Sequence, residues 1–284
     1  MARIIVVGSV ALDEMVYLDE PMVPGRHLEG RDGGRRMGGG AANTGIPLAG
    51  AGHDVTLCSG VGTDGDSEDL LAQLAVTGVD TSLVVRQPGG PTRSLVMVDP
   101  RGERSIVNLR RVQGSEPLDG LRARSADWLY VRSRAKGLRE VLAEMTARTR
   151  IVAHVPPCVA GSRPAHVLVG SASDLDAEFL AAPFAAGREV AGDSLQWVVV
   201  TDGADGATAH GPDEVLQVAA ESVEVVDSTG AGDAFAAGLV HALASGSGMR
   251  DALRVAAAFG AAAVTRSASG LSAATAAELA ESLK

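Results

Sequence analysis

One stretch of the chain combines a carboxylate with a glycine-rich turn, a combination suited to phosphoryl transfer. The order Asp-Ser-Thr-Gly-Ala-Gly-Asp at 227–233 follows a β-branched segment and precedes an apolar run. It predicts a strand, a tight turn and a helix with Asp233 in its first turn. The backbone N–H groups of Gly230, Ala231 and Gly232 could stabilise developing negative charge while Asp233 deprotonates a hydroxyl. Taken alone, the same pattern is also typical of a capped helix start.

A second glycine run lies nearer the N-terminus, as Gly-Gly-Gly-Ala-Ala-Asn-Thr-Gly at 38–45. A helix is predicted over 41–50, with Asn43 in its first turn, where the amide offers a donor and an acceptor to a diol. Gly39 and its neighbours allow the backbone to approach a ligand closely. Asp13 follows the buried strand predicted at 3–7, at the edge of the sheet where open α/β folds bind ligands. A flexible loop, a helix cap and a turn residue are the alternatives for these positions.

Together, the two motifs resemble the paired signatures of the PfkB (ribokinase-like) carbohydrate kinases, and the resemblance runs from Val6 to near Leu271. It implies a doubly wound, mainly parallel α/β sheet flanked by helices, with a small β-sheet lid. It also implies transfer of the γ-phosphoryl group of ATP with Mg²⁺. On this resemblance Asp233 is the general base, and Asp13, Gly39 and Asn43 orient the sugar.

Two segments are predicted to form the lid within one domain, 1–284. Residues 14–37 contain prolines and glycines among short alternating stretches, which favours antiparallel strands over a βαβ crossover. Residues 92–109 predict a hairpin around a turn at 99–102. The resemblance implies that the lid covers the sugar and forms a homodimer contact. Asp64 is predicted to cap the helix 67–76, without a chemical role.

Two further polar residues are candidates for binding the acceptor. Asn108 and Arg132 resemble positions of the sulfofructose-kinase branch that hold the anionic end of a ketose, and a guanidinium suits a sulfonate or phosphate. Arg134 is an equal candidate if the strand register differs, and a solvated surface charge is the other interpretation of either arginine. Many ribokinases have Lys where Gly40 stands, and ketohexokinase-like members have Asn, so the identity of the sugar stays open.

The nucleotide side is predicted from weaker patterns. Thr201 ends a predicted buried strand, and Gly203 and Gly206 follow it. The resemblance implies that these residues and Thr229 contact ATP. Where the family usually has Asn-x-x-Glu to support Mg²⁺ through water, this chain has Ser-Ala-Ser-Asp at 171–174. Asp174 could hold such a water with a shorter reach. The resemblance further implies a monovalent cation, K⁺, bound near Asp227 and the loop 266–272.

Composition narrows the class of protein. The formal net charge is −10, which argues against nucleic acid or an anionic membrane surface as a partner. Cys58 and Cys158 lack metal-type spacing and are expected to be reduced thiols. The apolar start of the chain is soon followed by Asp13 and Glu14 and is interpreted as a strand, not a leader. The longest apolar run is too short to span a bilayer, so a cytoplasmic protein is predicted.

The favoured function is therefore an ATP-dependent sugar kinase that phosphorylates a hydroxyl, most simply a primary alcohol, of a ketose with an anionic end. Two alternatives share the fold: a nucleoside kinase, and a sugar or nucleotide sensor in which the weakened magnesium support has ended catalysis. A Rossmann dehydrogenase would need Gly-x-Gly-x-x-Gly after the first strand, and residues 8–13 lack it.

Overall fold

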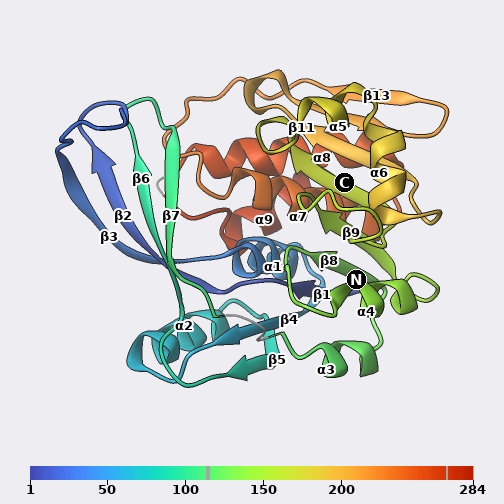
Figure 1. The fold of residues 1–284 in the computed structure, drawn as a ribbon, viewed down its shortest axis with the longest axis horizontal. Coiled ribbons are helices and arrows are strands. Elements are labelled where there is room, and N and C mark those ends of the chain that lie inside the picture. The colour runs from blue at the N-terminus through green and yellow to red at the C-terminus, as the bar shows by residue number, and fades with distance from the viewer. Residues whose placement is uncertain (113–115, 267, 284) are drawn as a thin grey trace.

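A nine-stranded central sheet forms the body of the computed structural model, which describes residues 1–112, 116–266 and 268–283 (Figure 1). Seven neighbouring strands run parallel, from β11 to β5, so their carboxyl ends meet at one edge. In spatial order the sheet consists of β13 (Val215–Val218), β12 (Ala207–His210), β11 (Trp197–Thr201), β10 (Val167–Ser171), β9 (Arg150–His154), β8 (Trp128–Val131), β1 (Arg3–Val7), β4 (Asp54–Val61) and β5 (Asp80–Arg86).

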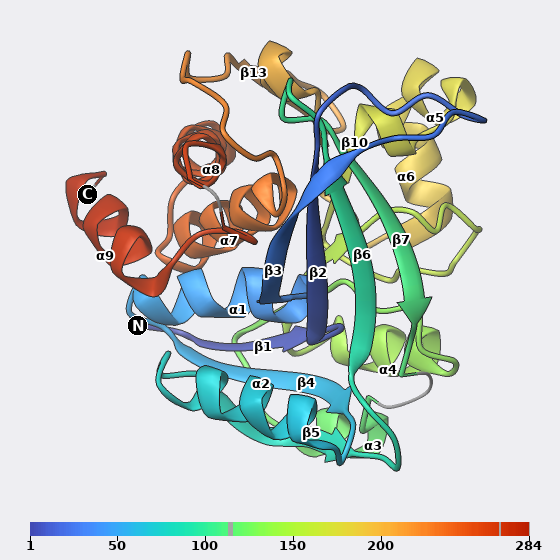
Figure 2. The same ribbon diagram turned by 90° about the vertical axis from the view of Figure 1, so that its left-hand side faces the viewer.

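Helices cover both faces of this sheet, as the second view shows (Figure 2). One face carries α1 (Gly40–Gly50), α2 (Gly65–Ala75), α7 (Ala231–Ala244), α8 (Met249–Val264) and α9 (Ala273–Ser282). The other carries α3 (Leu118–Ala123), α4 (Leu138–Met145), α5 (Ala177–Ala181) and α6 (Pro183–Ala191). Short 3₁₀ turns, η1 (Ala172–Asp174) and η2 (Gly203–Asp205), follow β10 and β11. None of the helices in the described ranges is long and apolar enough to cross a membrane.

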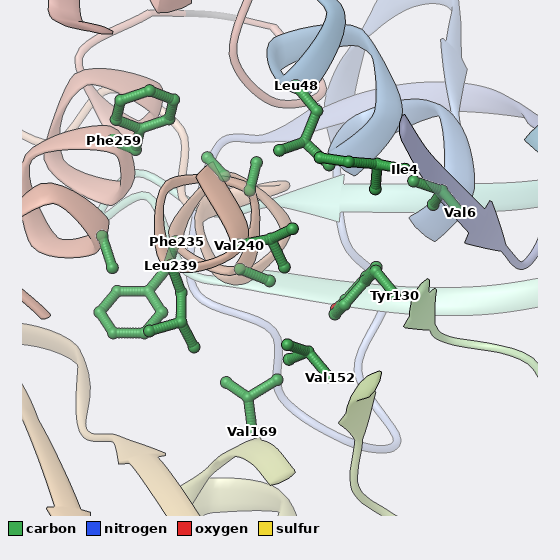
Figure 3. Packing of buried hydrophobic residues seen from close by; sticks show 14 of the residues in the cluster. Ile4, Val6, Leu48, Tyr130, Val152, Val169, Phe235, Leu239, Val240 and Phe259 are labelled. Carbon is green, nitrogen blue, oxygen red and sulfur yellow. The ribbon is translucent and has the colours of Figure 1, made fainter. Parts of the chain in front are cut away.

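Strand β1 shows how the sequence pattern produces these layers. Ile4 and Val6 join the core on the α7 side, while Ile5 and Val7 join the core on the α4 side. A parallel strand buried on both faces is a continuous apolar run, as predicted. Each such side chain contributes about 1.5–3 kcal/mol by burial. Figure 3 shows the core on the α7 side, in which α7 is surrounded by buried side chains that include Leu48, Tyr130, Val152, Phe235, Leu239 and Phe259.

Because aromatic residues make up only 3% of the chain, the helices pack through small side chains. A Cβ added to Gly238 of α7 would come within 2.9 Å of the Ala256 Cα of α8, so the two helices lie nearly backbone to backbone. The predicted helices at 41–50 and 67–76 are confirmed within a residue or two. Asp64 caps α2 as predicted, since its Oδ1 accepts the Ser67 N–H at 3.0 Å.

A smaller, four-stranded sheet stands at one side of the central sheet (Figure 1). In order, its strands are β3 (Gly30–Gly38), β2 (Ala11–Leu18), β6 (Thr92–Val98) and β7 (Arg104–Arg110). The β6–β7 pair is the predicted hairpin, and β2 and β6 pair in parallel. Strand β2 starts three residues before the expected lid boundary at 14. Asp13 therefore lies inside the small sheet and not in a loop after β1.

A pair of histidines joins the loop between α1 and β4 to the last turn of α7. His53 Nε2 lies 2.9 Å from His241 Nδ1, and the Ala2 N–H donates to His53 Nδ1 at 3.3 Å. Burial, His241 and the N-terminal charge lower the pKa of His53 from 6.5 to about 4. This contact helps fix α7 relative to the segment that carries Asn43.

We expect the protein to lose stability as the pH falls from about 6.5 to about 4. The unfolded chain binds a proton at His53 in that window while the folded chain does not, so protonation favours unfolding. In His53→Gln, whose amide can replace both hydrogen bonds, the fall in melting temperature over this window should be smaller by a few degrees. The exposed His27→Gln should match the wild type; equal curves for all three proteins would contradict the assignment.

Candidate active site

Asp233 lies in the first turn of α7, as the sequence predicts. The helix begins after Gly230, whose φ of 80° suits glycine and whose α-carbon packs against Gly270. At Gly232 an added Cβ would meet nothing within 4 Å, so the helix start faces open space. The first N–H groups of a helix have no partner within it, which makes this a place for negative charge. One of the three predicted donors is partly engaged, because the Ala231 N–H lies 3.3 Å from the Ser228 carbonyl.

Two other predicted residues meet Asp233 directly. The Asn43 amide of α1 donates to Asp233 Oδ2 at 3.0 Å, and the Arg132 guanidinium pairs with Asp233 Oδ1. Asp233 is 6% exposed, while the Arg132 side chain is about one-third exposed. Burial opposes the charge of Arg132, but Asp233 and the neighbouring Tyr130 outweigh it and raise the pKa of Arg132. A carboxylate, an amide and a guanidinium from three elements therefore converge at one helix start.

Three consecutive glycines make room for this arrangement. A Cβ on Gly38 would collide with the Asp13 carboxylate, and one on Gly40 would collide with the Arg132 side chain. Gly39 has φ 93°, and its added Cβ would come within 2.5 Å of the Ser9 carbonyl. The run was predicted to let the backbone approach a ligand. In the structure it lets the backbone approach the polar side chains of the site itself.

Asp13 lies in a row of polar residues that crosses the small sheet. Its cross-strand partners are Arg36 on β3 and Ser94 on β6, and Ser94 in turn faces Asn108 on β7. Residues opposite one another in a sheet share a face. Burial raises the pKa of Asp13, while hydrogen bonds from Ser94 and Ser269 and the charge of Arg36 oppose that rise. Asn108 thus shares this face but is exposed.

The predicted nucleotide loop follows β11 at the edge that also carries Arg132. Thr201 ends the strand, and Gly203 and Gly206 both have positive φ, at 50° and 92°. An added Cβ on Gly206 would collide with the Val218 carbonyl, so glycine is required there for packing. Thr229 is 4% exposed, and its Oγ1 has no hydrogen-bond partner within the described residues. That unpaired hydroxyl lies next to the α7 start but is itself buried, so a ligand could reach it only after its surroundings moved.

The pfkB family model, described as a pfkB family carbohydrate kinase, matches residues 1–276. The chain belongs to the pfkB family. An ATP-dependent ribose-1-phosphate kinase of Halopiger xanaduensis is 29% identical over 249 residues, 84% of each chain. A 1-phosphofructokinase of Haloferax volcanii is 27% identical over 278 residues, 88% of this chain and 87% of the relative. A nucleoside kinase of Burkholderia thailandensis, solved with inosine, has a TM-score of 0.81 at 19% identity, covering 99% of this chain and 96% of its own.

Solved ribokinase structures share the fold along nearly the whole chain, which confirms the predicted ribokinase-like architecture. The protein is accordingly a phosphotransferase with an alcohol acceptor, a sugar or nucleoside kinase of the pfkB family. ATP use by the family agrees with an ADP complex of a solved ribokinase.

Magnesium fits this site only as part of a metal–nucleotide complex. No cluster of three or more His, Cys, Asp or Glu side chains in the described residues could hold a metal by itself. Mg²⁺ commonly keeps several waters and is held by substrate phosphates plus one or two carboxylates. Asp174, exposed in η1 and close enough to Arg132 to influence its pKa, is the predicted carboxylate. Bound there, the ion would neutralise charge on the phosphates.

Asp227, the residue predicted to bind a monovalent cation, already has a cationic partner. It is completely buried; its Oδ1 accepts the Thr229 N–H at 2.8 Å and its Oδ2 accepts Arg36 Nη2 at 2.7 Å. A guanidinium and a metal cation would compete for the same oxygen, so the carboxylate as arranged does not fit K⁺. The Arg36 pair also ties β3 of the small sheet to the turn that precedes the α7 start.

We therefore expect replacing K⁺ with choline to change kcat/KM less than about twofold. In Arg36→Gln, which leaves a buried carboxylate unpaired, we expect a loss of stability of about 3 kcal/mol and partial rescue of activity by K⁺. Arg35→Gln is the matched control, because Arg35 lies on the same strand and pairs with the exposed Asp66. Strong K⁺ activation of the wild type would instead support the cation that the family resemblance implies.

Sequence reasoning missed Arg36, Ser94 and Ser269. Ser94 could have been found from the strand pairing, because the hairpin 92–109 was predicted and its first strand lies beside Asp13. Ser269 reaches Asp13 at 3.5 Å across 256 residues of sequence, and no local pattern indicates that contact.

Proposed function

We propose that the protein transfers the γ-phosphoryl group of ATP to a hydroxyl, most simply a primary alcohol, of a ketose with an anionic end. The observation that carries the proposal is the convergence of Asp233, Asn43 and Arg132 at the start of α7. An acid and an amide suit a hydroxyl, and the partly exposed guanidinium suits a phosphate or sulfonate. Both curated relatives named above carry a phosphorylated sugar in their names.

In this mechanism Asp233 accepts the proton of the acceptor hydroxyl as that oxygen attacks the γ-phosphorus. The backbone N–H groups of Gly230, Ala231 and Gly232 stabilise charge on the transferring group. Asp13, Gly39 and Asn43 orient the sugar, while Thr201, Gly203, Gly206 and Thr229 contact the nucleotide. Asn108, from the same sheet face as Asp13, reaches the acceptor when the small sheet closes as a lid and excludes water.

The ion pair between Arg132 and Asp233 has a consequence for this mechanism. Arg132 holds Oδ1 of Asp233 and Asn43 donates to Oδ2, so both oxygens that could accept the proton are occupied. An anionic acceptor offers Arg132 a competing partner and thereby releases Asp233 for proton transfer. A neutral sugar offers no such exchange, so the acceptor's own charge favours its phosphorylation.

A screen for acceptor-dependent ADP release tests the proposal, with ketoses, aldoses, nucleosides, sugar phosphates and sugar sulfonates at equal concentration. We expect an anionic ketose to give the highest kcat/KM. In Arg132→Ala, that value should fall by about 10–100-fold, with little change for a neutral sugar. An equal loss for both would refute the anionic-end assignment. A best acceptor among nucleosides would favour a nucleoside kinase, and no turnover with any acceptor would favour a sensor.

A homodimer through the small sheet is part of the proposal. Edge strand β7 carries Ile106, Val107 and Leu109, each 46–49% exposed. Exposed apolar side chains on an unpaired edge strand are an interface candidate. The cytoplasmic location remains a prediction from the sequence.

A further inference from the structure

A cavity of about 270 Å³ lies at the carboxyl ends of β8 and β9, where the chain enters α4. It is outside the set of residues that the proposed mechanism uses. It is large enough for a small anion with part of an organic molecule. Its lining includes Arg134, Gly137, Arg139, Pro157, Ser162 and Arg163.

Arg163 is the most unusual side chain in this cavity. It is only 3% exposed, and it takes part in no ion pair within the described ranges. Its buried Nε has no hydrogen-bond partner there. Burial and the nearby Arg134 lower the pKa of Arg163 to about 10, which still leaves it charged at neutral pH. A buried charge without a counter-ion is costly, so the site is chemically incomplete as it stands.

The surroundings of Arg163 add further positive potential. Arg134 and Arg139 are exposed at the rim, and neither forms an ion pair with a described residue. Helix α4, eight residues long, starts after Gly137 with no side-chain cap, and its first residues line the same cavity. Of its first N–H groups, that of Leu138 is engaged by the Ala135 carbonyl at 3.3 Å. Glu140 is the acidic residue of the lining, and it too is exposed.

Neighbouring groups do not supply the missing negative charge. His154, the last residue of β9, is neutral: burial and the charges of Arg132, Arg163 and Arg134 lower its pKa to about 3. Asp233 is occupied by Arg132, whose guanidinium points away to the α7 start. In a chain with a net charge of −10, this local surplus of cations stands out.

We propose that Arg163, Arg134, Arg139 and the start of α4 form a binding site for the phosphoryl group of a small molecule. A tetrahedral phosphate matches several guanidiniums and a helix N-terminus at once. The phosphoryl group has two possible sources. One is a free anion, either inorganic phosphate or a phosphorylated effector. The other is a phosphorylated acceptor whose phosphate lies at the end opposite the hydroxyl that is phosphorylated. The site itself does not depend on the proposed kinase function, because its ligand binding can be measured without turnover.

The test is a thermal-shift and calorimetric titration of the full chain with sodium phosphate, against sodium chloride of matched ionic strength. We expect saturable binding and a rise in melting temperature of about 2 °C or more at saturation. Arg163→Met should abolish that increment. It should also raise the melting temperature of the phosphate-free protein, since it removes an unpaired buried charge. A purely structural arginine would instead lower it.

Two substitutions of exposed arginines test the proposal without disturbing the core. Arg139→Gln changes an exposed side chain and should weaken phosphate binding by about tenfold or more. Arg254→Met on α8 removes an equal charge from an exposed ion pair and should leave binding unchanged. If Arg163→Met and Arg139→Gln bind phosphate as the wild type does, the proposal fails. It also fails if Arg132→Met alone removes binding, because phosphate would then occupy the active site.

Kinetics separate the two sources of the phosphoryl group once an acceptor is known. If the cavity holds the far end of the acceptor, phosphate competes with the acceptor and Arg163→Met raises its KM. If the ligand is a free anion or effector, the acceptor KM is unchanged in Arg163→Met. Either pattern supports the cavity as a phosphoryl site.

Discussion

Asp233→Asn is expected to lower kcat by about 10²–10⁴-fold, while ATP and the acceptor still bind within a few-fold of the wild type. The amide keeps the shape of the side chain and can still accept the Asn43 N–H, but it cannot accept a proton at neutral pH. Steady-state kinetics measure the change in kcat, and isothermal titration of each ligand measures the change in binding. A kcat within tenfold of the wild type would show that another group is the base.

The substitution also leaves Arg132 without its carboxylate partner, and that effect needs its own control. The double variant Arg132→Met, Asp233→Asn removes both charges of the pair. If the lost turnover came from an unpaired guanidinium, the double variant would recover activity towards a neutral sugar. We expect no recovery, because the proton acceptor is still missing. Melting temperatures of all three variants show whether any loss reflects unfolding.

Much of the architecture follows from local patterns in the sequence. Strands such as β1 are continuous β-branched runs because they are buried on both faces, and helix α7 is marked by the glycine turn that opens it. The hairpin of β6 and β7 follows from alternation around a turn. These features depend on neighbours in sequence, which is why they could be predicted without knowing the fold.

The contacts that complete the site depend on distant segments and could not be predicted in this way. Arg36 meets Asp227 across 191 residues of sequence, and it neutralises the carboxylate expected to bind K⁺. Arg132 and Arg134 were equal candidates for the acceptor because their strand register was open. The structure turns Arg132 to Asp233, while Arg134 lines the separate cavity with Arg163.

The glycine run at 38–40 also could not be fully explained from neighbouring residues in the sequence. The run at 38–40 shows from sequence alone that a Cβ is excluded, but not which atoms exclude it. For Gly38 these are the Asp13 carboxylate atoms, and for Gly40 the Arg132 side chain. The side chain missing at 40, where many ribokinases have Lys, would fill the space that Arg132 occupies. The identity of residue 40 and the position of Arg132 are therefore linked.

This link leads to the second large effect: Gly40→Ala should lower kcat/KM for an anionic acceptor by about 10–100-fold. The new Cβ would lie closer than 3.0 Å to Arg132 Cδ and Nε, so the guanidinium must leave its place beside Asp233. Residue 40 is already helical, and alanine has a higher helix propensity than glycine, so the backbone should tolerate the change. Parallel kinetics with an anionic and a neutral sugar measure the effect.

Gly65→Ala is the matched control, because Gly65 is likewise the first residue of a helix and an added Cβ would meet nothing within 4 Å. It should leave both acceptors unaffected. For Gly40→Ala, the neutral sugar should lose little, or gain, because Asp233 is freed from its ion pair. Equal losses for the two sugars would mean that alanine disturbs Asn43 or the α1 start in general. A selective loss would show that the position of Arg132, set by the absent side chain at 40, decides which acceptors the enzyme takes.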